Sequence, residues 1–280
     1  LLVNYLQKQS NLAKFRCVHE QTIRDYMSAV ISEQDRDLLR RVALLGRVRH
    51  HDFDHVALAT GLTEADEPYQ RLGRLITAGL VAKGAISYRV KPDVLRDELL
   101  IDWLTTTTSE DGSRRAPSEA ANDLYRRLID ALQRQSWSRE SEAILLALAR
   151  TDQELRASDV QAGLVEPWLL RLHVEVLDNK SVAPQLAVDA VTRIVAGYPE
   201  RALAFASQVR GRLLGSSLLS EASAEEAALA LELVKKLARL LLHIATGRVN
   251  LAQGTRVLRE LIELTTLEAQ FSDSDAADRD

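Results

Sequence analysis

The chain has 280 residues, of which 46% are apolar and 27% are charged, and its formal net charge is −4. This length allows two domains with a sizeable core, and the acidic balance argues against nucleic acid or an anionic membrane as a partner. The single cysteine, Cys17, excludes an internal disulfide. Without a long apolar run or a signal peptide, the sequence predicts a cytoplasmic protein.

Alanine, leucine, arginine and glutamate dominate the chain and aromatic residues make up only 5% of it, which favours a mainly α fold. The chain opens with Leu1-Leu2-Val3 rather than methionine, and we expect it to be a piece of a longer protein. Residues 1–31 contain two short helical patterns. They predict a small helical segment that precedes the first domain.

Ser32, with Asp35 three residues later, predicts the start of a helix that runs to about Gly46. Its apolar stripe consists of Leu38, Leu39, Val42 and Leu45. The other side carries Arg36, Arg40 and Arg41, followed by Arg47 and Arg49. We interpret these arginines as a solvated face or a docking surface for an acidic neighbouring domain, with a nucleic-acid patch as the alternative.

The segment His50-His51-Asp52-Phe53-Asp54-His55 is the densest group of metal-capable side chains. His51 and His55 have the i, i+4 spacing that two ligands on one helix can use. Asp52 is better suited to cap the next helix. Because His173 and His243 lack an adjacent aspartate, no second ligand group is visible, and the sequence predicts no metal site.

Residues 53–104 predict a winged helix within a domain that spans 32–104. A short helix from Phe53 to Thr60 is followed by a second one, which Thr63 and Asp66 start and Gly79 ends. The second helix has an apolar face made by Tyr69, Leu72, Leu75 and Ile76. Two strands, Leu80–Ala82 and Ile86–Val90, form the wing, and a last helix opens at Pro92-Asp93 and carries Leu95, Leu99 and Trp103.

The second helix of this domain is a poor reader of duplex DNA. Its first turn holds Glu64, Asp66 and Glu67, which repel phosphates, and Arg71 and Arg74 do not form a basic face by themselves. We therefore expect no DNA binding through this helix. An exposed basic wing with Lys83, Arg89 and Lys91 would favour the alternative, a transcription regulator that binds DNA.

The segment VKPDVLRDELL, Val90–Leu100, resembles the end of the winged-helix domain in STAND-type P-loop ATPases, relatives of AAA+, NB-ARC and NACHT proteins. That family has a Met-His-Asp tripeptide here. Lys91 and Pro92 stand at the Met and His positions, Asp93 matches the Asp, and Arg96 and Asp97 match the pair that follows. The family's histidine reaches the ADP β-phosphate, which Pro92 cannot do; Pro-Asp is similar to the branch of bacterial antiviral defence ATPases.

The resemblance implies that Lys91, Pro92, Asp93 and Arg96 couple the winged helix to its neighbours and that Arg96→Ala alters activation more than stability. It also implies that ATP and Mg²⁺ bind to an upstream NTPase domain. This chain contains no Walker A sequence. We expect no cofactor and no ATP binding in the chain itself.

Residues 105–117, TTTTSEDGSRRAP, are polar and predict a linker. Residues 118–271 predict an α-helical array of degenerate HEAT-like or TPR-like hairpins, and the acidic residues 272–280 predict a disordered tail. Two apolar stripes in the array read as core: Leu233, Leu237, Leu240, Leu241 and Ile244, then Val257, Leu258, Leu261 and Leu264. Trp137 and Trp168 read as packing anchors, with a partner contact as the alternative.

No nucleophile, carboxylate pair or metal cluster stands out, so the sequence predicts no catalytic residue in this chain. The preferred hypothesis is the regulatory and sensing part of a STAND-like ATPase. In that hypothesis residues 118–270 bind a protein ligand or other subunits, and the full-length protein forms a homo-oligomer. The alternatives are the DNA-binding regulator and a non-catalytic helical scaffold.

Overall fold

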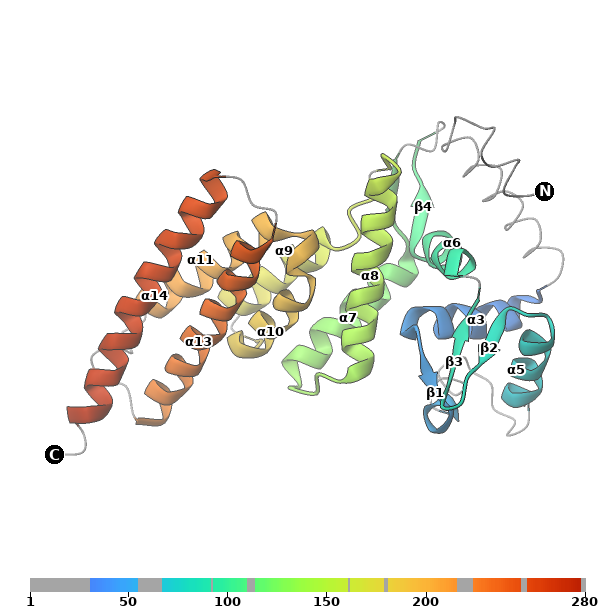
Figure 1. Cartoon of the computed structure of the whole chain (residues 1–280), viewed down its shortest axis with the longest axis horizontal. Helices are drawn as coiled ribbons and strands as arrows, with labels where there is room; N and C mark the ends of the chain where they lie inside the picture. Colours follow the sequence, from blue (N-terminus) through green and yellow to red (C-terminus); the bar gives the residue numbers. More distant parts are fainter. Residues whose placement is uncertain are drawn as a thin grey trace. The chain divides into compact units, whose positions relative to one another are not determined.

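The computed structural model describes residues 31–54, 67–91, 93–109, 114–160, 162–178, 181–215, 224–247 and 251–277 (Figure 1). The described part is mainly helical with small antiparallel sheets, which confirms the predicted mainly α class. The chain forms two compact units. The first contains the described residues up to Asp123 together with Arg150–Leu164, and the second contains Leu124–Ala149 and the described residues from Val165 onward.

The first unit begins with helix α3 (Glu33–Leu45), strand β1 (Val48–Arg49) and the short 3₁₀ helix η1 (His50–Asp52). Helix α5 (Glu67–Thr77), strands β2 (Val81–Lys83) and β3 (Ser87–Val90), and helix α6 (Asp93–Leu104) follow. The strands form one antiparallel sheet in the order β1-β3-β2, with Val48 opposite Tyr88 and Val81 opposite Val90.

This element order is the one expected of a winged helix. Both predicted wing strands are present, each within one residue of its predicted start, and β1 is an additional strand that two residues of sequence could not signal. The helix predicted for Phe53–Thr60 is described only at Phe53 and Asp54. Gly61, Thr63 and Asp66 lie outside the described residues.

The boundaries of helix α3 are fixed by the residues at its two ends. The Ser32 hydroxyl accepts a hydrogen bond from the Asp35 amide at 3.1 Å, as the capping pattern predicts. The helix ends at Gly46, whose φ of +71° disfavours a side chain. Leu38, Leu39 and Val42 are fully buried, where α3 packs against α6 and β3.

One residue of the predicted apolar face of α5 is placed differently. Tyr69 keeps 45% of its surface exposed, because its hydroxyl donates a hydrogen bond to Asp54 Oδ1 at 2.6 Å. Its ring packs on Phe53 with centroids 5.1 Å apart. The hydrogen bond to Asp54 is the main reason that the pKa of Tyr69 lies above 10.0.

The predicted linker contains a strand pair. Strand β4 (Thr105–Thr107) is antiparallel to β5 (Arg115–Pro117), with Thr105 opposite Pro117. The Arg114 amide also donates to Ser109 Oγ at 3.0 Å. Threonine favours strands, and a two-stranded ribbon needs few apolar residues, so polarity alone concealed the pairing. The sequence predicted a polar linker here and did not predict the strand pair within it.

The remaining elements are helical. They are α7 (Glu119–Gln133), α8 (Arg139–Ala157), α9 (Glu166–His173), the π-helical turn η2 (Val174–Asp178), α10 (Pro184–Ile194), η3 (Val195–Gly197), α11 (Pro199–Gly215), α13 (Ala224–Thr246) and α14 (Leu251–Ala277). Every described helix is either too short or too polar to cross a membrane.

Helix α8 runs without a break to Ala157. One boundary differs from the prediction. Helix α14 continues to Ala277, so residues 272–277 are helical rather than disordered. These residues include neither proline nor glycine, and an existing helix therefore extends through them without a break.

Helix α13 is the centre of the second unit, where it packs against α10, α11 and α14. Its predicted stripe, Leu233, Leu237, Leu240, Leu241 and Ile244, is buried throughout. On α14, Val257 and Leu264 are buried, but Leu258 is 62% exposed. Leu261 is half-buried, so of the four residues of this predicted stripe only Leu258 faces away from the helices α11 and α13 that α14 packs against. Trp168 is fully buried, as a packing anchor would be.

Candidate domain-coupling site on helix α6

Helix α6 carries the segment that the sequence singled out for coupling. Lys91 and Asp93 are exposed at its start, and Pro92 lies outside the described residues. The Lys91 amide donates to the Leu80 carbonyl at 2.9 Å, which continues the pairing of β2 with β3. Of the predicted apolar side of α6, Leu95 and Leu99 are buried and Trp103 is half-buried.

Arg96 points to the C-terminal end of α3. Its Nε donates to the Ala43 carbonyl oxygen at 2.8 Å, and its Nη2 would lie 3.2 Å from a Cβ placed on Gly46. The last carbonyls of a helix lack partners and carry its negative dipole end, so a guanidinium is well placed there. Burial, followed by the nearby Arg150, lowers the pKa of Arg96 from its usual range. Arg96 therefore joins α6 to α3 within the winged-helix fold itself.

Asp97, the next residue, makes the contact to a different element. Its Oδ2 accepts a hydrogen bond from Arg150 Nη2 at 3.0 Å, and Arg150 lies in the part of α8 that belongs to the first unit. The Asp97 side chain is 23% exposed. Burial raises the pKa of Asp97 above 3.8, and Arg150 opposes that rise. From the sequence, Asp97 stood out only because it matches the family motif. Its contact with Arg150 could not be predicted, because local sequence patterns do not indicate a partner 53 residues away.

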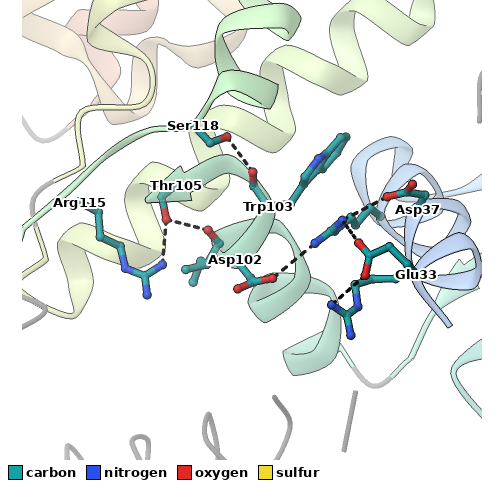
Figure 2. A network of polar contacts seen from close by, with 10 residues as sticks. Glu33, Asp37, Asp102, Trp103, Thr105, Arg115 and Ser118 are labelled. Carbon is teal, nitrogen blue, oxygen red and sulfur yellow. Dashed lines mark hydrogen bonds and ion pairs between the residues drawn. The ribbon is translucent and has the colours of Figure 1, made fainter. Parts of the chain in front are cut away.

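The opposite end of α6 meets a charged network (Figure 2). Arg40 Nη1 lies 3.2 Å from Glu33 and 3.1 Å from Asp37 on its own helix. Its Nη2 lies 3.6 Å from Asp102 of α6, and the Arg40 side chain is only 14% exposed. Arg36 also pairs with Glu33. Of the arginines that the sequence grouped on this side of α3, Arg36 and Arg40 are thus paired with carboxylates within the unit.

The end of α6 is tied to the strands and to the next helix (Figure 2). Thr105 Oγ1 donates to the Ile101 carbonyl at 2.7 Å and accepts from Arg115 Nη1 at 2.8 Å. Ser118 Oγ donates to the Trp103 carbonyl at 2.7 Å and also accepts the Ala121 amide, which caps α7. Polar side chains therefore connect α6 and its last turn to α3, α8, β5 and α7.

The histidine cluster does not converge on one point. The His50 ring packs on Tyr88 with centroids 4.5 Å apart, while exposed His51 Nε2 lies 3.3 Å from Asp52 Oδ1. Asp52 lies inside η1 rather than at a helix cap, and His55 lies outside the described residues. Within the described ranges, no three metal-capable side chains gather closely enough to hold an ion.

The second unit contains one notable apolar cavity, of 230 Å³, between η2, α10, α11 and α13. Leu213, Leu229 and Leu233 line its apolar walls. Arg212 also lines it, and this side chain donates through Nη1 to the Val176 carbonyl of the π-helical turn. π-Helical turns often occur at functional sites, and the sequence contained no signal for this one.

Comparisons with models of protein families, with curated proteins and with solved structures find no match to this chain.

Proposed function

We propose that this chain is the regulatory and sensing part of a STAND-like ATPase that acts in the cytoplasm, with α6 as the element that couples its winged helix to the rest of the first unit. The observation that carries the proposal is the set of polar contacts around α6. Arg96, Asp97 and Asp102 each contact a different partner, and Arg96 and Asp97 belong to the segment that resembles the family's coupling motif.

Such a helix is suited to a switch between two discrete arrangements. Besides its apolar packing on α3, it is linked to α3 and α8 by individual charged contacts, each of which can break and reform as a unit. The raised pKa of Asp97 indicates that burial weakens its charged form. A half-buried pair such as Asp97–Arg150 adds little net stability. Its role in this proposal is to favour one arrangement of α6 over the other.

The helical second unit would supply the sensing surface. Its cavity is apolar, and Leu229 at its wall is 49% exposed. A protein partner, either a ligand or another subunit, would place an apolar side chain there, since 230 Å³ is room for one large side chain. Binding would bias the switch if the partner prefers one of its states.

The test uses the whole protein that contains this chain. We expect it to bind and hydrolyse ATP through an upstream phosphate loop, and we expect Arg150→Ala to change its rate of ADP release at least threefold. Arg134→Ala, an exposed arginine of α7's end outside the α6 contacts, is the matched control and should leave the rate unchanged. The 280-residue chain alone should show no heat of ATP-Mg²⁺ binding.

Two results would overturn the proposal. One is a whole protein without ATP binding, and the other is micromolar ATP binding by the isolated chain. If Arg150→Ala and Arg134→Ala change the ADP release rate equally, the coupling role of α6 is refuted, while the proposal that the whole protein is an ATPase still stands.

A further inference from the structure

The sheet of the first unit has one buried face and one basic face. Residues directly opposite each other in a sheet share a face. Val48, Tyr88 and Val90 are buried, so the alternate positions point outward. Arg49, opposite Ser87, and Arg89, opposite Ala82, therefore lie on the outer face.

The residues that flank the strands extend this face. Arg47 directly precedes β1 and Lys91 directly follows β3, so both border the sheet next to these two arginines. Arg47, Arg49 and Lys91 are exposed and Arg89 is half-buried. We call Arg47, Arg49, Arg89 and Lys91 the basic sheet face. None of the strand residues of this sheet is acidic.

These four side chains differ from several other cations of the unit. Arg40, Arg71 and Arg74 each pair with a carboxylate. The side chains of the basic sheet face form no hydrogen bond or ion pair within the described part of the chain. Exposed cations that are kept apart from carboxylates, in a protein of net charge −4, indicate an anionic ligand.

We infer that the basic sheet face binds the phosphate backbone of a nucleic-acid strand without regard to its sequence. Two residues of extended chain span at most about 7 Å, so the cations within each pair, Arg47 with Arg49 and Arg89 with Lys91, are close enough to contact successive phosphates of a nucleic-acid strand. Three of the four residues are arginines, whose planar fork suits phosphate. Cations on two neighbouring strands, with no carboxylate among the strand residues, fit the uniformly charged polyphosphate backbone.

The wing tip adds an apolar contact. Ile86, at the tip between β2 and β3, is 73% exposed, the largest value among the large apolar residues of the described chain. Exposed Lys83 lies at the end of β2 on the same wing. An apolar side chain beside cations is suited to lie against an unstacked base or between base steps.

Helix α5 does not take part in this surface. Glu67 in its first turn pairs with Arg71, and Arg74 pairs with Asp35 at 3.1 Å. The charges of this helix are thus satisfied within the unit. The inferred contact is through the sheet and the wing, and not through the helix that usually enters the groove in helix-turn-helix proteins.

The experiment measures fluorescence anisotropy of a labelled thymidylate oligomer of about 20 nucleotides with the whole 280-residue chain, and repeats it with a duplex and with polyglutamate. Four phosphate contacts predict a slope of log affinity against log salt near −3, or about a 50-fold loss between roughly 50 and 200 mM salt. Arg49→Gln with Lys91→Gln should reduce the slope by about 1.4.

The matched control is Arg134→Gln with Arg139→Gln, which removes the same charge from exposed arginines outside the sheet. We expect this variant to bind the oligomer within twofold of the unchanged chain, and Ile86→Ser to weaken binding without changing the salt slope. Equal losses in the sheet and control variants would overturn the inference, and so would an absence of oligomer and duplex binding. Polyglutamate binding of similar affinity that the sheet variant abolishes would assign the face to an acidic protein instead.

Discussion

Truncation of Arg96 tests whether α6 is fastened to α3 by one side chain. Arg96→Ala removes a charged hydrogen bond to the Ala43 carbonyl, which contributes about 1.5–3 kcal/mol, and a cation at a helix C-terminus, which contributes about 0.3–1 kcal/mol. Because the two overlap and the side chain is only half-buried, we expect a loss of about 2 kcal/mol. This differs from the sequence-based expectation that the substitution would affect activation more than stability.

Gly46 provides the second arm of the same experiment. Alanine at a φ of +71° and ψ of −53° is strained by roughly 1–3 kcal/mol, and its Cβ would also lie 3.2 Å from Arg96 Nη2. Arg96→Ala removes that contact but not the backbone strain. The double variant should therefore be less destabilised than the sum of the two single variants, by about 0.5 kcal/mol or more.

Hydrogen exchange of the amides of α3 and α6 measures the local free energy of opening directly. Arg134→Ala, which removes an exposed arginine outside this contact, is the control and should leave these amides unchanged. A loss below about 0.5 kcal/mol for Arg96→Ala, or strictly additive effects with Gly46→Ala, would refute the reasoning that Arg96 caps α3.

Two further predictions concern buried carboxylates. Burial raises the pKa of Asp97 above 3.8, so the contribution of this carboxyl to stability is greatest below that pH and declines as the pH rises through its folded pKa. The stability of Asp97→Asn relative to the unchanged chain, measured by urea titration, should therefore rise between pH 4 and 7. A stability difference that stays constant with pH would contradict this. Asp152 is fully buried and accepts a hydrogen bond from the Leu164 amide at 2.7 Å. Asp152→Ala should therefore lower the free energy of unfolding by about 2–4 kcal/mol in the same titration. A loss below about 1 kcal/mol would show that water replaces the carboxylate.

Local patterns of the sequence determined much of the fold. Ser32 and Gly46 mark the ends of α3 through contacts within a few residues, and the stripe on α13 has the 3.6-residue period of a buried helix face. The wing strands follow from alternation bounded by turn residues. Each of these patterns involves residues that are close together in the sequence, so the sequence alone is enough to predict the element.

The tertiary structure decided which charges are paired and which remain open. The sequence grouped Arg40 with Arg47 and Arg49 as one basic face, but Arg40 meets Asp102, 62 positions later, and is neutralised. Arg47 and Arg49 instead join Arg89 and Lys91, because β1 pairs with β3. Neither the net charge nor the local spacing of residues can predict such pairings. Only the register of the sheet brings cations from separate segments onto one face, since strand pairing depends on residues about 40 positions apart, where the sequence holds no periodic signal.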